Sequence, residues 1–168
     1  MTKQPKVAII MGSDSDFGVL KESIKFLKDS GIDVDVNVIS AHRTPEHAEQ
    51  FAKSAEKNGF EVIIAAAGKA AHLAGVLAAY TVLPVIGIPI KSSTMDGLDS
   101  LLSMVQMPKG IPVATVAIDG AYNAAILAMQ ILALSYPDIK KIMVDFKKNM
   151  ALEVEKKNEK IKIEVENL

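Results

Sequence analysis

The chain has 168 residues, of which 49% are hydrophobic and 23% are charged, and this is the length and composition of one folded domain rather than of a disordered chain. A formal net charge of −1 gives no reason to expect nucleic acid or an anionic membrane as a partner. The sequence has no cysteine, which excludes disulfides and thiolate metal sites and fits a reducing compartment, so we expect a cytoplasmic protein.

Short apolar runs alternate along the chain with longer segments of helical period. We interpret the runs as strands buried on both faces of a sheet. They cover residues 7–11, 34–39, 62–67, 85–88 and 113–118.

The segments of helical period cover residues 17–30, 45–58 and 70–80. Gly31 and Gly59 follow the first two as C-caps, and Thr44 before Pro45 is typical of an N-cap. Strands separated by helices of this length pair in parallel through right-handed crossovers. The sequence therefore predicts an α/β domain of three layers, with a central parallel sheet of about five strands.

Polar segments follow the first three strands. They are residues 12–16, 40–45 and 68–73, which together carry serines, aspartates, two histidines and an arginine. The carboxyl ends of parallel strands lie at one edge of a sheet, and ligands bind there where the strand order reverses. We therefore expect the site at this edge.

The first polar segment, Gly12 to Asp16, opens a helix. Its free N–H groups and the hydroxyls of Ser13 and Ser15 could hold a phosphate, although N-capping is the simpler interpretation. Asp14 and Asp16 would repel a phosphate, so we expect one to face solvent and the other to accept a neutral hydroxyl such as that of ribose. The glycine pattern matches neither the P-loop nor the dinucleotide fingerprint.

The second segment places His42 and Arg43 just before the Thr44 cap, in a loop. A guanidinium can bind phosphate through two hydrogen bonds, although loop arginines are usually solvated. An imidazole exchanges protons near neutral pH, so His42 is a candidate acid/base. Metal binding with His47 is the rival role, which the intervening proline and the lack of cysteine disfavour. His47 itself fits a structural or solvated position.

The third segment is rich in small residues, from Gly68 through Ala70 to Gly75. Small side chains let the backbone approach a ligand, or let two helices approach each other, and the sequence does not choose between these. His72 lies among alanines, where a buried structural histidine is the simpler interpretation.

Six segments over residues 7–134 occur in an order and spacing that can be compared with known families: MGSDSD, SAHRTP, AGKAAHL, LPVIGIP, GLDSLLSMVQMPKGIPVATVAI and NAAILAMQILAL. In these segments the chain resembles the N5-carboxyaminoimidazole ribonucleotide mutases, the PurE family. The resemblance implies a flavodoxin-like domain that moves a carboxylate from the exocyclic nitrogen of an aminoimidazole ribonucleotide to ring carbon 4. It also implies that the reaction uses no metal and no organic cofactor.

The resemblance also assigns roles to residues of the three loops. Ser13, Asp16 and Arg43 correspond to residues that bind the ribotide, with Ser15 and Ser40 as supporting contacts. His42 corresponds to the acid/base residue. The segment that contains Gly68, Ala70, His72 and Leu73 would close over the reacting carboxylate and form a small dry pocket for CO2.

Two residues depart from the family pattern. Lys69 stands where the mutases usually have glycine, and Ala74 where they usually have proline. A carboxylase of the same family that uses free CO2 is the alternative activity, and AAHL resembles the mutase form. A flavin-binding or mononucleotide-binding module without catalysis is a further alternative, disfavoured because no aromatic beyond Phe17 borders the three loops. A purely structural oligomeric protein is the last.

The C-terminal third of the chain bears on assembly. Residues 123–134 are apolar on nearly every face, so we expect a buried helix, too short for a membrane span, that contacts another subunit. The resemblance implies a homo-octamer in which residues 103–108 approach a neighbour's site. Residues 138–168 carry 8 lysines and 7 acids and predict a solvated helix or partly frayed tail of this single domain.

Overall fold

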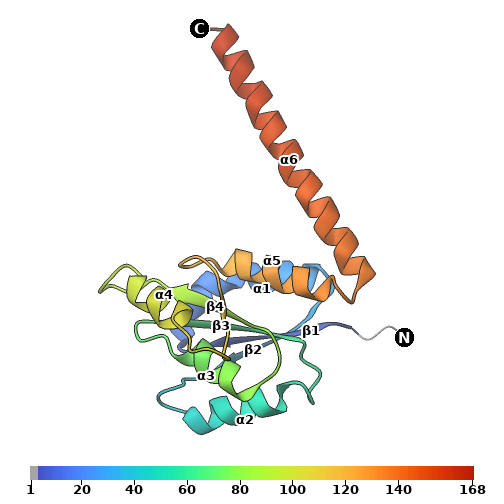
Figure 1. Cartoon of the computed structure of the whole chain (residues 1–168). Helices are drawn as coiled ribbons and strands as arrows, with labels where there is room; N and C mark the ends of the chain where they lie inside the picture. The colour runs from blue at the N-terminus through green and yellow to red at the C-terminus, as the bar shows by residue number, and fades with distance from the viewer. Residues whose placement is uncertain (1–3) are drawn as a thin grey trace.

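The computed structural model describes residues 4–168. Its centre is a five-stranded parallel sheet in the order β2-β1-β3-β4-β5, with helices on both faces (Figure 1). The strands are β1 Lys6–Met11, β2 Asp33–Val38, β3 Val62–Gly68, β4 Val85–Ile90 and β5 Ala114–Thr115. This arrangement confirms the predicted three-layer flavodoxin-like fold.

Helices cover the two faces of the sheet unequally. The helices are α1 Phe17–Asp29, α2 Pro45–Ala55, α3 Leu73–Tyr80, α4 Leu98–Val105, α5 Ala121–Leu132 and α6 Pro137–Glu166, with a 3₁₀ turn η1 at Asp14–Asp16. Helices α1 and α5 and the start of α6 lie on one face, whereas α2 and α3 lie on the other (Figure 1). No helix within residues 4–168 is long and apolar enough to cross a membrane.

The two cores explain why the central strands are apolar throughout. Along β1, Val7, Ile9 and Met11 face the core shared with α1 and α5. Ala8 and Ile10 face the core shared with α2 and α3. Because successive side chains of a strand point to opposite faces, a strand covered on both sides needs apolar residues at every position.

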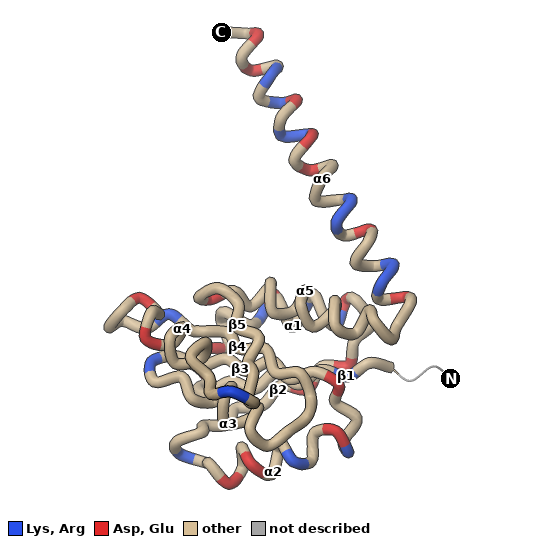
Figure 2. The backbone as a smooth tube through the Cα atoms, in the orientation of Figure 1, with Lys and Arg blue, Asp and Glu red and all other residues tan. Residues whose placement is uncertain are grey.

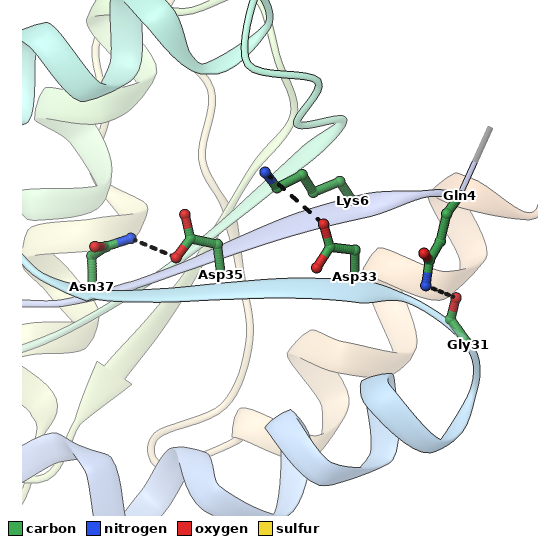
Figure 3. Close-up of polar contacts among 6 residues, drawn as sticks. All are labelled: Gln4, Lys6, Gly31, Asp33, Asp35 and Asn37. Carbon is green, nitrogen blue, oxygen red and sulfur yellow. Dashed lines mark hydrogen bonds and ion pairs between the residues drawn. The ribbon is translucent and has the colours of Figure 1, made fainter.

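Strand β2 differs from the prediction of a strand buried on both faces. It is the edge strand, and it is only partly buried because Asp33, Asp35 and Asn37 occupy alternate positions. Figure 3 shows these polar side chains on one face, with Asp33 3.9 Å from Lys6 Nζ and Asn37 donating to Asp35. The opposite face, with Val34, packs on the α1 side. A polar edge discourages pairing with strands of other molecules.

Strand β5 is also shorter than predicted. The sequence predicted a strand over residues 113–118, whereas the structure has only the two-residue strand Ala114–Thr115, after which regular pairing ends. It stays beside β4 through the Val116 amide, which donates to the Gly87 carbonyl, and the Asp119 amide, which donates to the Pro89 carbonyl.

The helix ends confirm the predicted caps in part. Gly31 and Gly59 have φ of 79° and 85°, the left-handed conformation expected of a residue after a helix. Thr44 stands at the N-cap position of α2, but its hydroxyl donates to the Ser40 carbonyl instead of capping the helix. Helix α3 begins at Leu73 instead of residue 70, which leaves the preceding residues in a loop.

The C-terminal residues form one long helix. Ile139 and Met143 of α6 are buried in the core, Ile142 and Phe146 pack against it, and the later part of the helix projects away from the domain (Figure 1). Lysine and glutamate residues are distributed along this projecting part (Figure 2). Helix α5 buries most of its apolar residues within the chain, against α1 and the sheet, so its burial does not require another subunit.

Candidate functional site

A cavity of about 690 Å³ lies at the carboxyl edge of the sheet. It lies where the strand order reverses, because β1 is followed by β2 on one side and has β3 on the other. Every residue that the sequence analysis placed in the site lines this cavity. These are Ser13, Ser15, Asp16, Ser40, His42, Arg43, Gly68, Ala70, His72 and Leu73.

The first loop is held by its own serines. Ser13 Oγ accepts from the Ser15 amide at 3.3 Å, and so caps η1. Ser15 Oγ lies 2.9 Å from Ser13 Oγ and 3.1 Å from Asp16 Oδ1, and its one hydrogen can go to either. The sequence predicted a helix opening directly here, whereas the structure inserts this short turn before α1. Two hydroxyls and a carboxylate thus stand together at the cavity.

The two aspartates of this loop have different surroundings, as the charge argument predicted. Asp14 is exposed, whereas Asp16 is buried and only 7% exposed. Burial raises the pKa of Asp16 above its ordinary value, and the nearby carboxylates of Asp119 and Asp14 add to the rise. Asp16 is therefore a buried acceptor for which a hydroxyl donor would be a suitable partner.

Arg43 joins the second loop to the first. Its Nη2 donates to the Gly12 carbonyl at 3.3 Å, and its Nε donates to Ser40 Oγ at 3.4 Å. Ser40 Oγ also accepts from the Arg43 amide at 3.2 Å, so one serine orients both ends of the residue. The guanidinium stays exposed at the cavity, where its remaining N–H groups can bind an anion.

His42 and His72, which are thirty residues apart in the sequence, meet at the cavity. His42 Nε2 lies 2.7 Å from His72 Nδ1, and the rings meet edge to face. One hydrogen occupies this contact, so Nδ1 of His42 is the nitrogen left for another partner. His72 is exposed rather than buried, which corrects the simpler interpretation of its position.

The third loop contains a strained residue. Lys69 has φ of 56°, a conformation that favours glycine, and its side chain lines the cavity. Gly68, Ala70 and Leu73 line the cavity beside it. Small residues near the His42–His72 pair leave room for a ligand close to the imidazoles.

A fourth loop, which the sequence analysis missed, completes the wall. Ile90, the last residue of β4, lines the cavity together with Lys91, Ser92 and Ser93, which follow the strand. The sequence contained the signal for this loop, because the polar residues 91–93 follow a buried strand, as the other three polar segments do. Within residues 4–168, no group of three or more His, Asp and Glu side chains lies close enough together to hold a metal ion.

Comparison with known proteins agrees with the fold. The family model described as AIR carboxylase matches residues 6–153. The N5-carboxyaminoimidazole ribonucleotide mutase of Pyrococcus horikoshii is 57% identical over 160 residues, which are 95% of this chain and 90% of that protein. The enzyme of the same name from Thermotoga maritima is 54% identical over 157 residues, covering 94% and 92% of the two chains.

A solved structure is also similar. The crystal structure of Treponema denticola PurE superposes with a TM-score of 0.85 at 30% identity, and the match covers 94% of this chain and 98% of that one.

Proposed function

Since the chain belongs to the AIR carboxylase family, we propose that it is an isomerase of purine biosynthesis that converts N5-carboxyaminoimidazole ribonucleotide to 4-carboxyaminoimidazole ribonucleotide. The observation that carries this proposal is the cavity itself. It places an imidazole pair beside an arginine and a loop of serines and a buried aspartate.

Binding of the ribotide is divided between the first two loops. Arg43 binds the phosphate with the N–H groups that Gly12 and Ser40 leave free, and the hydroxyls of Ser13, Ser15 and Ser40 donate to the same end of the ligand. Asp16 accepts a hydrogen bond from a ribose hydroxyl. This division keeps the dianion beside the guanidinium and away from the buried carboxylate.

His42 moves one proton in two steps. When the carbamate C–N bond breaks, CO2 leaves and the electron pair stays on nitrogen, which takes a proton from the imidazolium of His42. Carbon 4 of the ring then attacks CO2 to form a C–C bond, and the imidazole removes the proton from that carbon. The proton count returns to its start, so one histidine is sufficient.

The third loop supplies the surroundings of the CO2 intermediate. Gly68, Ala70 and Leu73 present small or apolar surface to the cavity beside the imidazoles. Such a lining holds CO2 near carbon 4 and excludes water, which would otherwise hydrate CO2 to bicarbonate. No cofactor takes part in these steps.

We also propose that the molecule is a cytoplasmic homo-oligomer, specifically an octamer. Helix α4 exposes Leu98, Leu102 and Val105, and the last of these lies in the segment 103–108 that the resemblance places near a neighbour's site. The projecting part of α6 exposes further apolar residues. A second copy of the chain is the partner that would cover these surfaces.

The activity is tested by offering the purified protein two substrates. One reaction contains the carbamate ribotide, and the other contains aminoimidazole ribonucleotide with bicarbonate. We expect efficient turnover of the carbamate. Efficient turnover of the second mixture alone would instead identify the carboxylase that uses free CO2, and no turnover of either would contradict both activities.

A further inference from the structure

Asp119 lies in the segment between β5 and α5 and does not line the cavity itself. It is hydrogen-bonded to the fourth loop, residues 90–93, whose side of the cavity we call the fourth wall. Its Oδ1 accepts a hydrogen bond from the Lys91 amide at 2.9 Å. Its own amide donates to the Pro89 carbonyl at 2.8 Å. The two bonds hold the chain on either side of Ile90, where β4 ends and the wall begins.

The backbone conformation of Asp119 supports a specific role. Its φ of 55° lies in the left-handed region, which costs a residue with a side chain roughly 1 kcal/mol. Glycine would avoid this cost and asparagine would reduce it, but glycine would lose the acceptor for the Lys91 amide. The Asp119 carboxylate therefore provides the acceptor for the Lys91 amide, which a glycine at this position would lack.

Helix α4 also contacts the fourth wall. Ser92, which is buried, donates to Asp99 at 3.1 or 3.2 Å. The hydroxyl of Ser100, which is fully buried, lies 2.9 Å from the Ile90 carbonyl and 2.8 Å from the Gly97 carbonyl, and its one hydrogen can go to either. Lys91 lies between Ile90 and Ser92, and its amide donates to the carboxylate of Asp119, a side chain outside the cavity.

Gly97, just before α4, lies close to both segments. A Cβ added to Gly97 would come within 2.7 Å of Ile118 Cγ2 and 3.2 Å of Lys91 Cα. Ile118 precedes Asp119 in the chain, so the segment before α5 and the loop after β4 both pack near Gly97 and leave no room for a side chain there.

Asp119 also lies near the first loop. Its negative charge helps to raise the pKa of the buried Asp16 carboxyl, after burial itself. The side chain thus lies between a residue that we assign to the ribose and the loop that forms the fourth wall.

We propose that Asp119 is a positioning residue of the ribotide site, whose carboxylate holds the Lys91 amide and thereby fixes residues 91–93 as one wall of the cavity. This inference rests on the proposed function, since it takes the ribotide as the ligand of the cavity that residues 91–93 line. Because these residues line the cavity and have no part in the proton transfer that we assign to His42, we expect loss of the Asp119 hydrogen bond to raise KM and to leave kcat nearly unchanged.

Two substitutions separate the hydrogen bond from charge and backbone strain. Asp119→Asn keeps an acceptor oxygen, removes the charge and tolerates a left-handed φ. Asp119→Gly removes the acceptor without adding strain. KM and kcat for the carbamate ribotide are measured at one fixed pH for all proteins, together with hydrogen exchange at the Lys91 amide.

We expect Asp119→Asn to keep KM within about twofold and Asp119→Gly to raise KM about tenfold, with faster exchange at Lys91. Unchanged KM in a folded Asp119→Gly protein would overturn the proposal even if its melting temperature fell, because that pattern indicates a structural role alone. If Asp119→Gly does not fold, Asp119→Ala, which also removes the acceptor, takes its place with the same expected rise in KM and faster exchange at Lys91, and an unchanged KM in that protein overturns the proposal. A raised KM in Asp119→Asn with slow exchange at Lys91 would also overturn it, because the effect would then come from the charge and not from the hydrogen bond. An inactive wild-type protein would instead contradict the proposed function.

Discussion

At the scale of single residues, the pairing of His42 with His72 leads to the first prediction. Replacing His42 with asparagine removes the group that gives and takes the proton, while Arg43 and Asp16 keep their positions. We expect kcat to fall by roughly 10²–10⁴-fold. The affinity for aminoimidazole ribonucleotide should change by only a few-fold, because the binding residues remain. Steady-state kinetics and calorimetric titration measure the two quantities.

His47 offers a matched control for this substitution. It is exposed in the first turn of α2, five residues from His42, and does not line the cavity. His47→Asn should therefore retain wild-type kcat and KM. Sustained turnover by the His42→Asn protein would show that another group transfers the proton.

Asp16 leads to a prediction about stability and pH. Burial raises its pKa in the folded protein above the ordinary value of 3.8, with Asp119 and Asp14 adding to the rise. For an acid with a raised pKa, the folded state loses stability as the pH rises from 3.8 through the raised value, so at neutral pH ionised Asp16 destabilises the free protein. Asp16→Asn should raise the free energy of unfolding at pH 7 and weaken ribotide binding roughly tenfold.

Urea denaturation at pH 7 and at about pH 3.5 measures this effect. The stability difference between variant and wild type should shrink at the lower pH, where Asp16 is mostly protonated in both states. A variant that is less stable than wild type at pH 7 would show that the hydrogen bonds of the carboxylate outweigh its burial.

At the scale of elements, the sequence predicted best the parts whose surroundings are uniform. Strand β3 lies between two strands and two helical layers, so an unbroken apolar run marked it clearly. Strand β2 is at the edge, and there the polar alternation was a sign of one open face. Strand β5 ends early because the regular ladder stops after Val116: the next amide to bond β4 is that of Asp119, three residues on, which donates to the Pro89 carbonyl.

The candidate site was also predicted only in part from the sequence. Position at the end of a buried strand identified the first three loops, and the same rule would have included Lys91 to Ser93. No local pattern could indicate that His42 and His72 touch, because their contact depends on how far the loops after β2 and β3 extend over the intervening β1. The strain at Lys69 also follows from the folded backbone and not from the sequence pattern alone.

The third loop provides a prediction at this scale. Lys69 is held at a φ of 56°, where a side chain costs roughly 1–2 kcal/mol that glycine avoids. Part of this gain is offset by the greater freedom of glycine in the unfolded chain. Lys69→Gly should therefore raise the free energy of unfolding by about 0.5–1 kcal/mol, measured by urea denaturation.

Lys69→Ala is the matched control, since it removes the same charge but keeps the strained conformation. It should give no gain in stability. Equal stabilisation by both substitutions would attribute the effect to the lysine charge and not to the backbone. Activity that falls equally in both would assign the lysine side chain a part in the site.

At the scale of the whole molecule, the projecting part of α6 presents a row of apolar residues on one side, which we call the stripe. With 3.6 residues per turn, Met150, Val154, Ile161 and Val165 lie on the same side of the helix as Met143, which is buried in the core. The stripe thus continues the face that already packs against the domain. Most of the stability of a helix in a protein comes from the packing of its apolar face, and the projecting part of α6 packs against nothing within residues 4–168. A second copy of the chain would bury the stripe.

The corresponding prediction compares two double substitutions of equal net charge. Val154→Glu with Ile161→Lys disrupts the stripe, whereas Leu152→Glu with Ile163→Lys changes the opposite side. The two pairs are matched, because their exposed fractions are 65% and 56% against 50% and 58%. If copies of the chain assemble through the stripe, light scattering after size-exclusion chromatography should give a smaller mass for the first variant and an unchanged mass for the second. Equal masses for both variants and the wild type would place the assembly elsewhere, with the exposed face of α4 as the next surface to alter.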